Sequence, residues 1–310
     1  VYPEPGMYTD VAVLDVASMH PTSIEELNLF GPYTKNFSDL KSARIAIKHG
    51  DLEPAGKMLG GALKPYLKED GDAEALSYAL KIVINTVYGL TCAKFDNPFR
   101  DIRNVDNIVA KRGALFMIDL KNFVQEQGFR VVHIKTDSIK ITNATPEIIE
   151  AVMDFGRKYG YEFEHEETYQ KMCLVNDAVY IATKSDGTWA PVGAQFAVPY
   201  VYKTLFSGDP IEFDDVCVTK QVTTAMYLDY DADRPMYEFD KDTPNLKFIG
   251  KTGRFVPIKE MCGGGALLRE KDGKYYAVTG TKGHLWLEAY AARSRWKDGT
   301  IDESYFTELV

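Results

Sequence analysis

The chain has 310 residues, of which 45% are hydrophobic and 26% are charged, and this composition excludes the disordered and fibrous classes. Its length exceeds that of one average domain, so we expect two or three subdomains around a main core. The net charge of −9 excludes a chain that is basic throughout, so any contact with nucleic acid requires lysine and arginine to gather in one groove.

The cysteine pattern and the apolar runs bear on the compartment. The four cysteines include no CxxC pair, which indicates neither a zinc site nor a disulfide framework and favours a reducing compartment. No apolar run approaches the roughly 18 residues of a membrane span, and no signal peptide precedes the first predicted strand. We therefore expect a cytoplasmic protein that has no membrane partner.

The first predicted elements are a strand, a turn and a helix. Residues 11–16 form an apolar, β-branched run, which predicts a strand that carries Asp15 near its end. Pro21 then stands near the start of a predicted helix that extends to Phe30 and is ended by a Gly-Pro pair. Apolar residues at helical spacing over residues 40–47 predict a further helix.

Two long helices are predicted in the next part of the chain. Apolar residues recur every 3.6 residues over 75–87, with Asp72 as the N-cap and Gly89 as the stop. A second amphipathic helix is predicted over residues 105–127, where Gly128 ends it.

A hairpin is predicted after these helices. The strand-like runs 129–134 and 138–142 are separated by only three residues, which include Asp137. Beyond Gly187 the periodicity weakens, so we expect a domain boundary near residues 184–190. The other predicted elements are a helix over 146–159, a strand over 161–165, a second hairpin of 172–175 with 179–183, and a closing helix over 285–296.

Two carboxylates stand out for their chemistry. Asp15 ends a predicted strand and Asp137 lies in a predicted hairpin turn, so both can reach one point if their strands are neighbours in one sheet. Mg²⁺ prefers few carboxylates together with phosphate oxygens and water. Two ions roughly 3.5–4 Å apart could activate an attacking hydroxyl and stabilise a leaving pyrophosphate. Taken alone, each aspartate is better explained as an ordinary turn residue.

One face of the helix predicted over 75–87 carries a cation, an amide and an aromatic ring. Lys81, Asn85 and Tyr88 are spaced i, i+4 and i+7. A lysine there can neutralise charge on a transferring phosphoryl group, and the other two can line a nucleotide pocket. The spacing alone favours an ordinary helix face over a nucleotide pocket, with Lys81 in solvent and Asn85 and Tyr88 half-buried.

Three segments, taken in order, resemble the three polymerase motifs of family B DNA polymerases, especially those of bacteriophages. Residues 15–21 (DVASMHP) resemble D-x-x-S-L-Y-P-S, and residues 81–89 (KIVINTVYG) resemble K-x-x-x-N-S-x-Y-G. Residues 136–138 (TDS) resemble the end of Y-G-D-T-D-S. Three matches in order are far more specific than one. The resemblance covers roughly residues 8–185.

The resemblance implies an α+β, right-hand polymerase fold. The palm would be an antiparallel sheet backed by helices, the fingers short and helical, and the C-terminal region β-rich with a closing helix. The implied division is palm for 1–30, fingers for 31–90, palm again for 91–185, and a thumb-like or C-terminal DNA-binding region for 186–310.

The function implied is that of a template-directed DNA polymerase core, which adds dNTPs to a primer 3′-hydroxyl by two-metal nucleotidyl transfer. The implied cofactors are two Mg²⁺ ions, which Mn²⁺ could replace, and the implied partners are primer–template DNA, dNTPs and processivity or replisome proteins. Such a protein acts in the host cytoplasm if a phage encodes it. No D-I-E type exonuclease motif occurs, so we expect no proofreading by this chain.

Position by position, the resemblance assigns roles to individual residues. Asp15 and Asp137 would bind both ions, and the Val16 carbonyl would complete one ion site. Lys81 would contact the triphosphate and protonate the leaving pyrophosphate. The phosphates would be held by backbone N–H groups of Ala17, Ser18 and Met19. The incoming base pair would pack against Asn85, Tyr88 and Gly89, while DNA would be contacted by Lys135, Thr136, Ser138 and Tyr180.

The sequence departs from the family pattern at three positions. His20 replaces the tyrosine that packs under the sugar, so we expect altered discrimination against ribonucleotides. Lys135 replaces the first aspartate of the third motif, and Ala178 replaces the lysine of the K-x-Y motif, leaving Tyr180 equally well explained as a core residue. Fingers cations are assigned by position only: Arg44, Lys64 and Lys68.

Two other function classes stay open at this point. Lys135 and the acidic net charge also fit a catalytically weak or inactive palm-fold subunit that binds DNA. A metal-dependent nuclease would use paired carboxylates as well, but its chemistry does not require the cation, amide and aromatic ring on one helix face.

Overall fold

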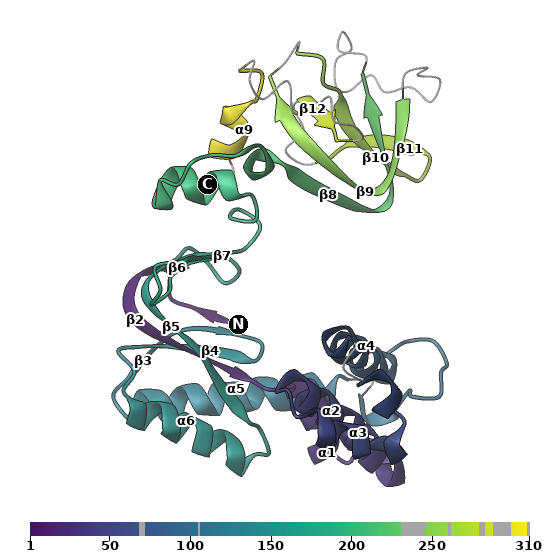
Figure 1. Cartoon of the computed structure of the whole chain (residues 1–310), viewed down its shortest axis with the longest axis vertical. Coiled ribbons are helices and arrows are strands. Elements are labelled where there is room, and N and C mark those ends of the chain that lie inside the picture. Colours follow the sequence, from purple (N-terminus) through teal and green to yellow (C-terminus); the bar gives the residue numbers. More distant parts are fainter. Residues whose placement is uncertain are drawn as a thin grey trace. The chain divides into compact units, whose positions relative to one another are not determined.

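The computed structural model describes residues 1–67, 72–104, 106–230, 246–259, 262–278, 283–287 and 299–308. The chain divides into two compact units: Val1–Asp177 with Ala182–Thr188, and Ala178–Ile181 with Trp189–Val310. Each unit combines helices with a curled antiparallel sheet, which confirms the predicted α+β class (Figure 1). Among the helices of the described ranges, not one has both the length and the apolar character that crossing a bilayer requires.

The first unit is built on five strands that are hydrogen-bonded in the order β1-β3-β4-β2-β5. The strands are β1 (Tyr2–Pro3), β2 (Gly6–Val16), β3 (Arg130–Lys135), β4 (Ser138–Thr142) and β5 (Phe163–Leu174). The helices are α1 (Met19–Glu26), α2 (Thr34–Lys48), α3 (Leu52–Lys57), α4 (Ala73–Thr91), α5 (Ile108–Glu126) and α6 (Pro146–Lys158).

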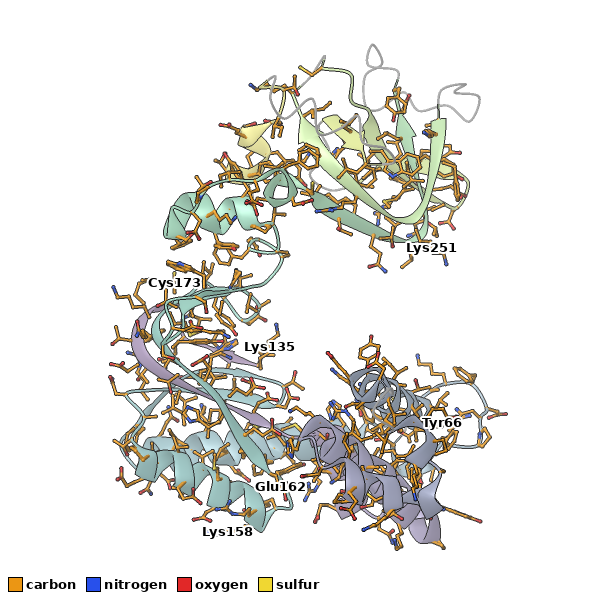
Figure 2. The ribbon with its side chains drawn as sticks, viewed as in Figure 1. Tyr66, Lys135, Lys158, Glu162, Cys173 and Lys251 are labelled. Carbon is orange, nitrogen blue, oxygen red and sulfur yellow. The ribbon has the colours of Figure 1, made fainter. Side chains whose placement is uncertain are left out.

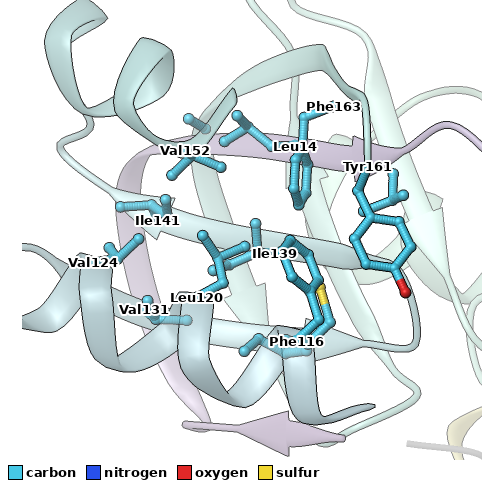
Figure 3. Packing of buried hydrophobic residues seen from close by; sticks show 14 of the residues in the cluster. Leu14, Phe116, Leu120, Val124, Val131, Ile139, Ile141, Val152, Tyr161 and Phe163 are labelled. Atoms are coloured by element: carbon cyan, nitrogen blue, oxygen red, sulfur yellow. The ribbon is translucent and has the colours of Figure 1, made fainter. Parts of the chain in front are cut away.

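Helices α5 and α6 cover one face of this sheet. Successive residues of a strand point to opposite faces, and the helix-covered face carries Leu14, Ile139 and Ile141, all fully buried. Figure 3 shows these side chains packed against Phe116 and Leu120 of α5. Burying each of these large apolar side chains contributes about 1.5–3 kcal/mol, so this core holds the sheet and helices together.

The opposite face of the sheet carries polar and charged residues beside the buried Val11 and Val13. Asp15 on β2 is paired with Ser138 on β4, and Lys140 on β4 is paired with His133 on β3. In the same alternation Lys135 falls on this face, where its side chain projects from the end of β3 (Figure 2). Asp15 and Lys135 thus lie on the same face of the sheet, at the ends of β2 and β3.

Helix α4 begins as predicted but ends later. The Asp72 carboxylate accepts a hydrogen bond from the Ala75 N–H at 2.8 Å, which confirms the predicted N-cap. Gly89 does not end the helix, which continues to Thr91. A glycine that ends a helix commonly takes a left-handed conformation with positive φ. Gly89 does not have a positive φ, so the helix continues through it.

Two other predictions along the first unit are wrong in part. The first helix ends at Glu26 rather than at Phe30, and a short 3-10 turn (Gly31–Tyr33) follows. Residues 172–175 do not form a separate strand of a second hairpin, because Met172–Leu174 is the end of the long strand β5. Pairing with β2 along almost its whole length keeps β5 continuous.

Two glycines in helices should respond oppositely to alanine. At Gly156 in α6 a Cβ would lie 2.8 Å from the Tyr161 carbonyl oxygen, whereas at Gly89 in α4 it would meet open space. We expect Gly156→Ala to lower the free energy of unfolding by about 1–3 kcal/mol and Gly89→Ala to raise it by about 0.5–1 kcal/mol. Denaturant unfolding measures both; equal effects at the two positions would contradict the packing around α6.

The second unit contains a five-stranded sheet of order β11-β10-β8-β9-β12. The strands of this sheet are β8 (Val218–Asp229), β9 (Leu246–Ile258), β10 (Ala266–Lys271), β11 (Lys274–Ala277) and β12 (Gly283–Trp286). Strands β6 (Tyr180–Thr183) and β7 (Trp189–Val192) precede it in the chain, and two short helices flank it, α7 (Pro199–Tyr202) and α9 (Glu303–Thr307).

The predicted closing helix over 285–296 is not found where it was expected to start. Leu285 and Trp286 belong to β12, which is paired with β9, and residues 288–296 lie outside the described ranges. A short periodic apolar pattern fits both a helix and a strand. Here the pairing with the distant strand β9 makes these residues a strand.

His284 on β12 should make this unit sensitive to acid. Its side chain is fully buried, and within the described part of the chain neither ring nitrogen has a hydrogen-bond partner. Burial, assisted by Lys220, lowers the pKa of His284 to about 4. Between pH 6.5 and 4 the unfolded chain binds a proton that the folded chain does not, so stability falls as the pH falls.

We expect His284 to account for a loss of roughly 2–3 kcal/mol between pH 7 and pH 4. Unfolding curves recorded across this range, for the wild type and for His284→Phe, measure it. The variant should lose less stability in acid. The exposed His165, changed to Phe, is the matched control and should leave the pH dependence unaltered; equal acid sensitivity in all three proteins would exclude His284 as the cause.

Candidate functional site

A cavity of about 300 Å³ opens in the first unit, where β2, the β3–β4 turn, α1, α2 and α4 meet. The sequence predictions and this cavity share most of their residues. Its lining comprises Asp15, Val16, Ala17, Ser18, Met19, His20, Pro21, Arg44, Ile45, Lys48, Lys81, Ile84, Asn85, Asp137 and Glu164. Residues that lie up to 149 positions apart in the chain are therefore gathered at one place.

The two predicted acids come together because their strands are neighbours. Strands β2 and β4 are antiparallel, with Asp15 opposite Ser138, and β4 follows the turn that holds Asp137. The Val16 N–H donates a hydrogen bond to the Asp137 carbonyl oxygen at 2.9 Å. This bond ties the β3–β4 turn to the end of β2, so both carboxylates border the cavity.

The chain turns sharply between β2 and α1. Ser18 has φ 63° and ψ 51°, a left-handed conformation that lets the chain enter the helix directly after the strand. Arg44 of α2 donates from Nη1 to the Ser18 hydroxyl at 3.2 Å, which brings a guanidinium to this turn. The first helical turn begins at Met19, where N–H groups have no partner within the helix.

The structure corrects one of the predicted phosphate donors. The Ala17 N–H donates to the Glu162 carbonyl oxygen at 2.8 Å, so it is already engaged with the start of β5. Glu162 is labelled in Figure 2. Sequence motifs do not show which backbone groups a neighbouring strand uses. Of the three predicted donors, Ser18 and Met19 keep the assigned role as a prediction.

Helix α4 turns its predicted face to the cavity. Lys81 and Asn85 line the cavity and are exposed to solvent. Tyr88 lies behind them, where its ring stacks on His20 with centroids 4.5 Å apart and its hydroxyl donates to Asn107 at 3.2 Å. Gly89 is not among the lining residues.

Asp15 lies in a strongly negative, half-buried environment. Burial, and then the charges of Asp137, Glu166 and Glu164, raise the pKa of Asp15 to about 7, whereas Lys140 opposes this shift. A carboxyl group that is held in such surroundings favours either a proton or a cation at its oxygens. Strongly shifted groups in a cavity are frequent at functional sites.

Sequence reasoning missed several residues that border or influence this cavity. Glu164 of β5 lies opposite Asp15, and it pairs with Lys48 at 2.7 Å and with His49 at 3.3 Å. Glu166 is the extra residue of a β-bulge, since Val13 pairs with Glu167 and Leu14 with His165. The strand had been predicted over 161–165, but its pairing with β2 had not, and only that pairing brings these acids to Asp15.

Other predicted residues lie elsewhere. Lys135 and Thr136 are exposed at the β3–β4 turn, and Ser138 is half-buried at the start of β4. Tyr180 is buried on β6, with 8% of its surface exposed, in a segment that belongs to the second unit. Among the fingers cations that were assigned by position, Arg44 lines the cavity, Lys64 is exposed outside it, and Lys68 lies outside the described residues.

The donor set of the cavity suits a hard cation. Within the described ranges, no group of three or more His, Cys, Asp or Glu side chains is placed to hold a metal ion. The two aspartates and the nearby Val16 carbonyl are oxygen donors, and Mg²⁺ in phosphate-transfer sites takes only one or two carboxylates, with substrate and water supplying the rest. Burial and then repulsion by the neighbouring acids raise the pKa of Asp15, and a cation would relieve that repulsion.

Comparisons with known proteins add little to this picture. No protein-family model matches the chain, and no curated protein matches it. A solved structure, the family B DNA polymerase from the hyperthermophilic archaeon Pyrobaculum calidifontis, is similar to it over 100% of this chain, with 15% sequence identity and a TM-score of 0.49. The chain spans 45% of the length of that polymerase chain.

Proposed function

We propose that this chain is a template-directed DNA polymerase core that transfers nucleotides from dNTPs to a primer 3′-hydroxyl. The observation that carries the proposal is the cavity of the first unit, which is lined by residues of all three motif segments. The motifs are separated by many residues in the sequence, and an unrelated fold has no reason to bring Asp15, Lys81 and Asp137 to one cavity.

The proposed cofactors are two Mg²⁺ ions held by Asp15, Asp137 and the Val16 carbonyl. When bound, they would activate the primer hydroxyl and stabilise the charge of the leaving pyrophosphate. The acids of the cavity fit this role, because they repel one another in a half-buried place and offer only oxygen donors.

The cations around the cavity would bind the triphosphate. Lys81 comes from α4 and Arg44 and Lys48 from α2, and all three line the cavity, where Lys48 also pairs with Glu164. Arg44 lies beside the turn that precedes α1, where the N–H groups of Ser18 and Met19 would donate hydrogen bonds to phosphate oxygens. Lys81 would neutralise charge on the transferring phosphoryl group and give a proton to the pyrophosphate.

His20 is proposed to limit the space beside the sugar of the nucleotide. Its ring is fixed by stacking on Tyr88 and it lines the cavity. We expect His20→Ala to raise the ratio of ribonucleotide to deoxyribonucleotide incorporation by roughly tenfold, because a steric clash of about 1.4 kcal/mol is removed. Single-nucleotide extension with each substrate measures the ratio. The exposed His165→Ala is the control, and an unchanged ratio in His20→Ala would exclude this role.

Primer extension tests the proposed function. The full chain is incubated with a labelled primer, a template of defined sequence, Mg²⁺ and single dNTPs. The expected result is addition of the nucleotide that is complementary to the template and no addition when EDTA replaces Mg²⁺. Binding of the duplex without extension would instead support the inactive palm-fold subunit, and shortening of the primer without dNTPs would support the nuclease.

The inactive subunit is favoured by one observation, the presence of lysines next to the acids. Lys135 and Lys140 both stand on the polar face of the sheet, where the family pattern has an aspartate at position 135. Positive charge near a cation site weakens cation binding. We favour the enzyme because Asp15, Asp137 and Lys81, which would carry the chemistry, all line the cavity.

A further inference from the structure

Lys140 is a buried lysine that the proposed chemistry does not use. It lies in the middle of β4, opposite Val13 of β2 and His133 of β3, and only 4% of its surface is exposed. Its neighbours in sequence, Ile139 and Ile141, point into the apolar core, so Lys140 points to the polar face. Its Nζ lies 3.3 Å from the Ser138 hydroxyl, which draws the ammonium toward the catalytic end of the strand.

The charges around this ammonium are mainly negative. Asp15 and Glu166 attract it most strongly, Asp137 also attracts it, and Lys135 repels it. Burial lowers the pKa of Lys140 to about 8, and the attraction of these acids opposes that shift. A buried ammonium is costly unless it is paired, and crowded carboxylates are costly unless they are neutralised.

We propose that Lys140 is a positioning residue, whose ammonium is an internal counter-charge that holds Asp15, Asp137 and Glu166 together when no metal ion is bound. This inference depends on the proposed function in one respect: it takes from that function the cation site at Asp15 and Asp137. The ammonium and a divalent cation neutralise the same carboxylates. Lys140 therefore weakens the binding of the first ion and preserves the shape of the site without it.

Direct binding of Mn²⁺ tests this role without any catalysis. Electron paramagnetic resonance counts free Mn²⁺ in solutions of the full chain that contain neither DNA nor nucleotide. Lys140→Met removes the charge and keeps an unbranched apolar side chain of similar length. Loss of a unit charge that the same carboxylates attract should tighten Mn²⁺ binding by about tenfold or more. Lys140→Arg keeps the charge and should bind Mn²⁺ like the wild type.

A matched control removes a lysine elsewhere on the same sheet. Lys171 on β5 is exposed and lies opposite Thr9, so Lys171→Met should leave Mn²⁺ affinity unchanged. Wild-type or weaker Mn²⁺ binding by Lys140→Met would overturn the proposal. So would equal tightening in Lys171→Met, because it would show a general effect of net charge.

A second variant covers the case in which Lys140→Met folds but is too unstable for the Mn²⁺ measurement. Glu166→Gln removes one of the acids that face the ammonium. Thermal unfolding in EDTA should show that Lys140→Met is less stable than the wild type and that adding Glu166→Gln restores part of the loss. A lysine that only fills space with its methylene groups would not be rescued in this way, and absence of rescue would count against the counter-charge.

Failure of this inference can be told apart from failure of the proposed function. Tighter Mn²⁺ binding by Lys140→Met in a chain that never extends a primer would reject the polymerase and keep the counter-charge. Primer extension by the wild type with unchanged Mn²⁺ affinity in Lys140→Met would keep the polymerase and reject the counter-charge.

Discussion

Asp137→Asn is expected to abolish primer extension, with a loss of at least about 1000-fold in rate, or roughly 4 kcal/mol in transition-state stabilisation. The substitution keeps the size of the side chain and removes the charge that a divalent cation needs. The hydrogen bond from Val16 N–H to the Asp137 carbonyl involves the backbone, so the turn should keep its place. Extension rates under single-turnover conditions measure the effect.

Two controls make this result specific. Asp119→Asn changes an exposed aspartate of α5 in the same unit and should extend primers at the wild-type rate. In Asp137→Asn the pKa of Asp15, followed by carboxyl chemical shifts, should fall below about 7, because the charge of Asp137 contributes to raising it. Extension within tenfold of the wild-type rate would remove Asp137 from the catalytic machinery.

Lys81→Met is expected to slow extension by about 100-fold, or roughly 3 kcal/mol, with little change in affinity for DNA. Lys81 lines the cavity from α4, as Arg44 and Lys48 do from α2. Its positive charge matters most when negative charge builds up on the leaving pyrophosphate. Pre-steady-state incorporation at saturating dNTP separates this effect on the chemical step from weaker nucleotide binding.

The control for Lys81 is a lysine of the same region that lies away from the cavity. Lys57 of α3 pairs with Glu53 on the surface, and 76% of its side chain is exposed. Lys57→Met should incorporate nucleotides at the wild-type rate. A similar loss in both variants would point to a general effect of charge on DNA binding, and no loss in Lys81→Met would exclude the proposed role of Lys81.

Much of the first unit could be predicted because local patterns decide it. The N-cap at Asp72, the hairpin around Asp137 and the helix that begins at Pro146 depend on residues close in sequence. The strand that ends at Asp15 was predictable for the same reason. Its residues 11–14 form a continuous apolar run that is buried, directly before Asp15.

What escaped prediction depends on partners far away in the chain. The length of β5 and the position of Glu166 in a bulge follow from pairing with β2, which no local pattern specifies. The engaged Ala17 N–H depends on the same strand. In the second unit, Leu285 became part of a strand because β9 pairs with it, and short apolar runs fit a helix and a strand equally well.

The burial of Lys140 could have been suspected from the sequence. It follows Ser138 by two residues and stands between Ile139 and Ile141, so the alternation places it on the face of the carboxylates. The identity of the neighbouring strand was needed to show that Asp15 lies across from Ser138. Each segment of the candidate site can thus be predicted from residues close in sequence. Only the pairing of distant strands brings these segments together.

A crystal structure of the full chain with primer–template, Mn²⁺ and a non-hydrolysable dNTP analogue tests the shared cation site most directly. We predict anomalous density between the carboxylates of Asp15 and Asp137, with oxygen ligands at about 2.0–2.3 Å, as hard divalent cations require. Carboxylates more than about 10 Å apart in that complex, without density between them, would contradict two-ion geometry and the function that depends on it.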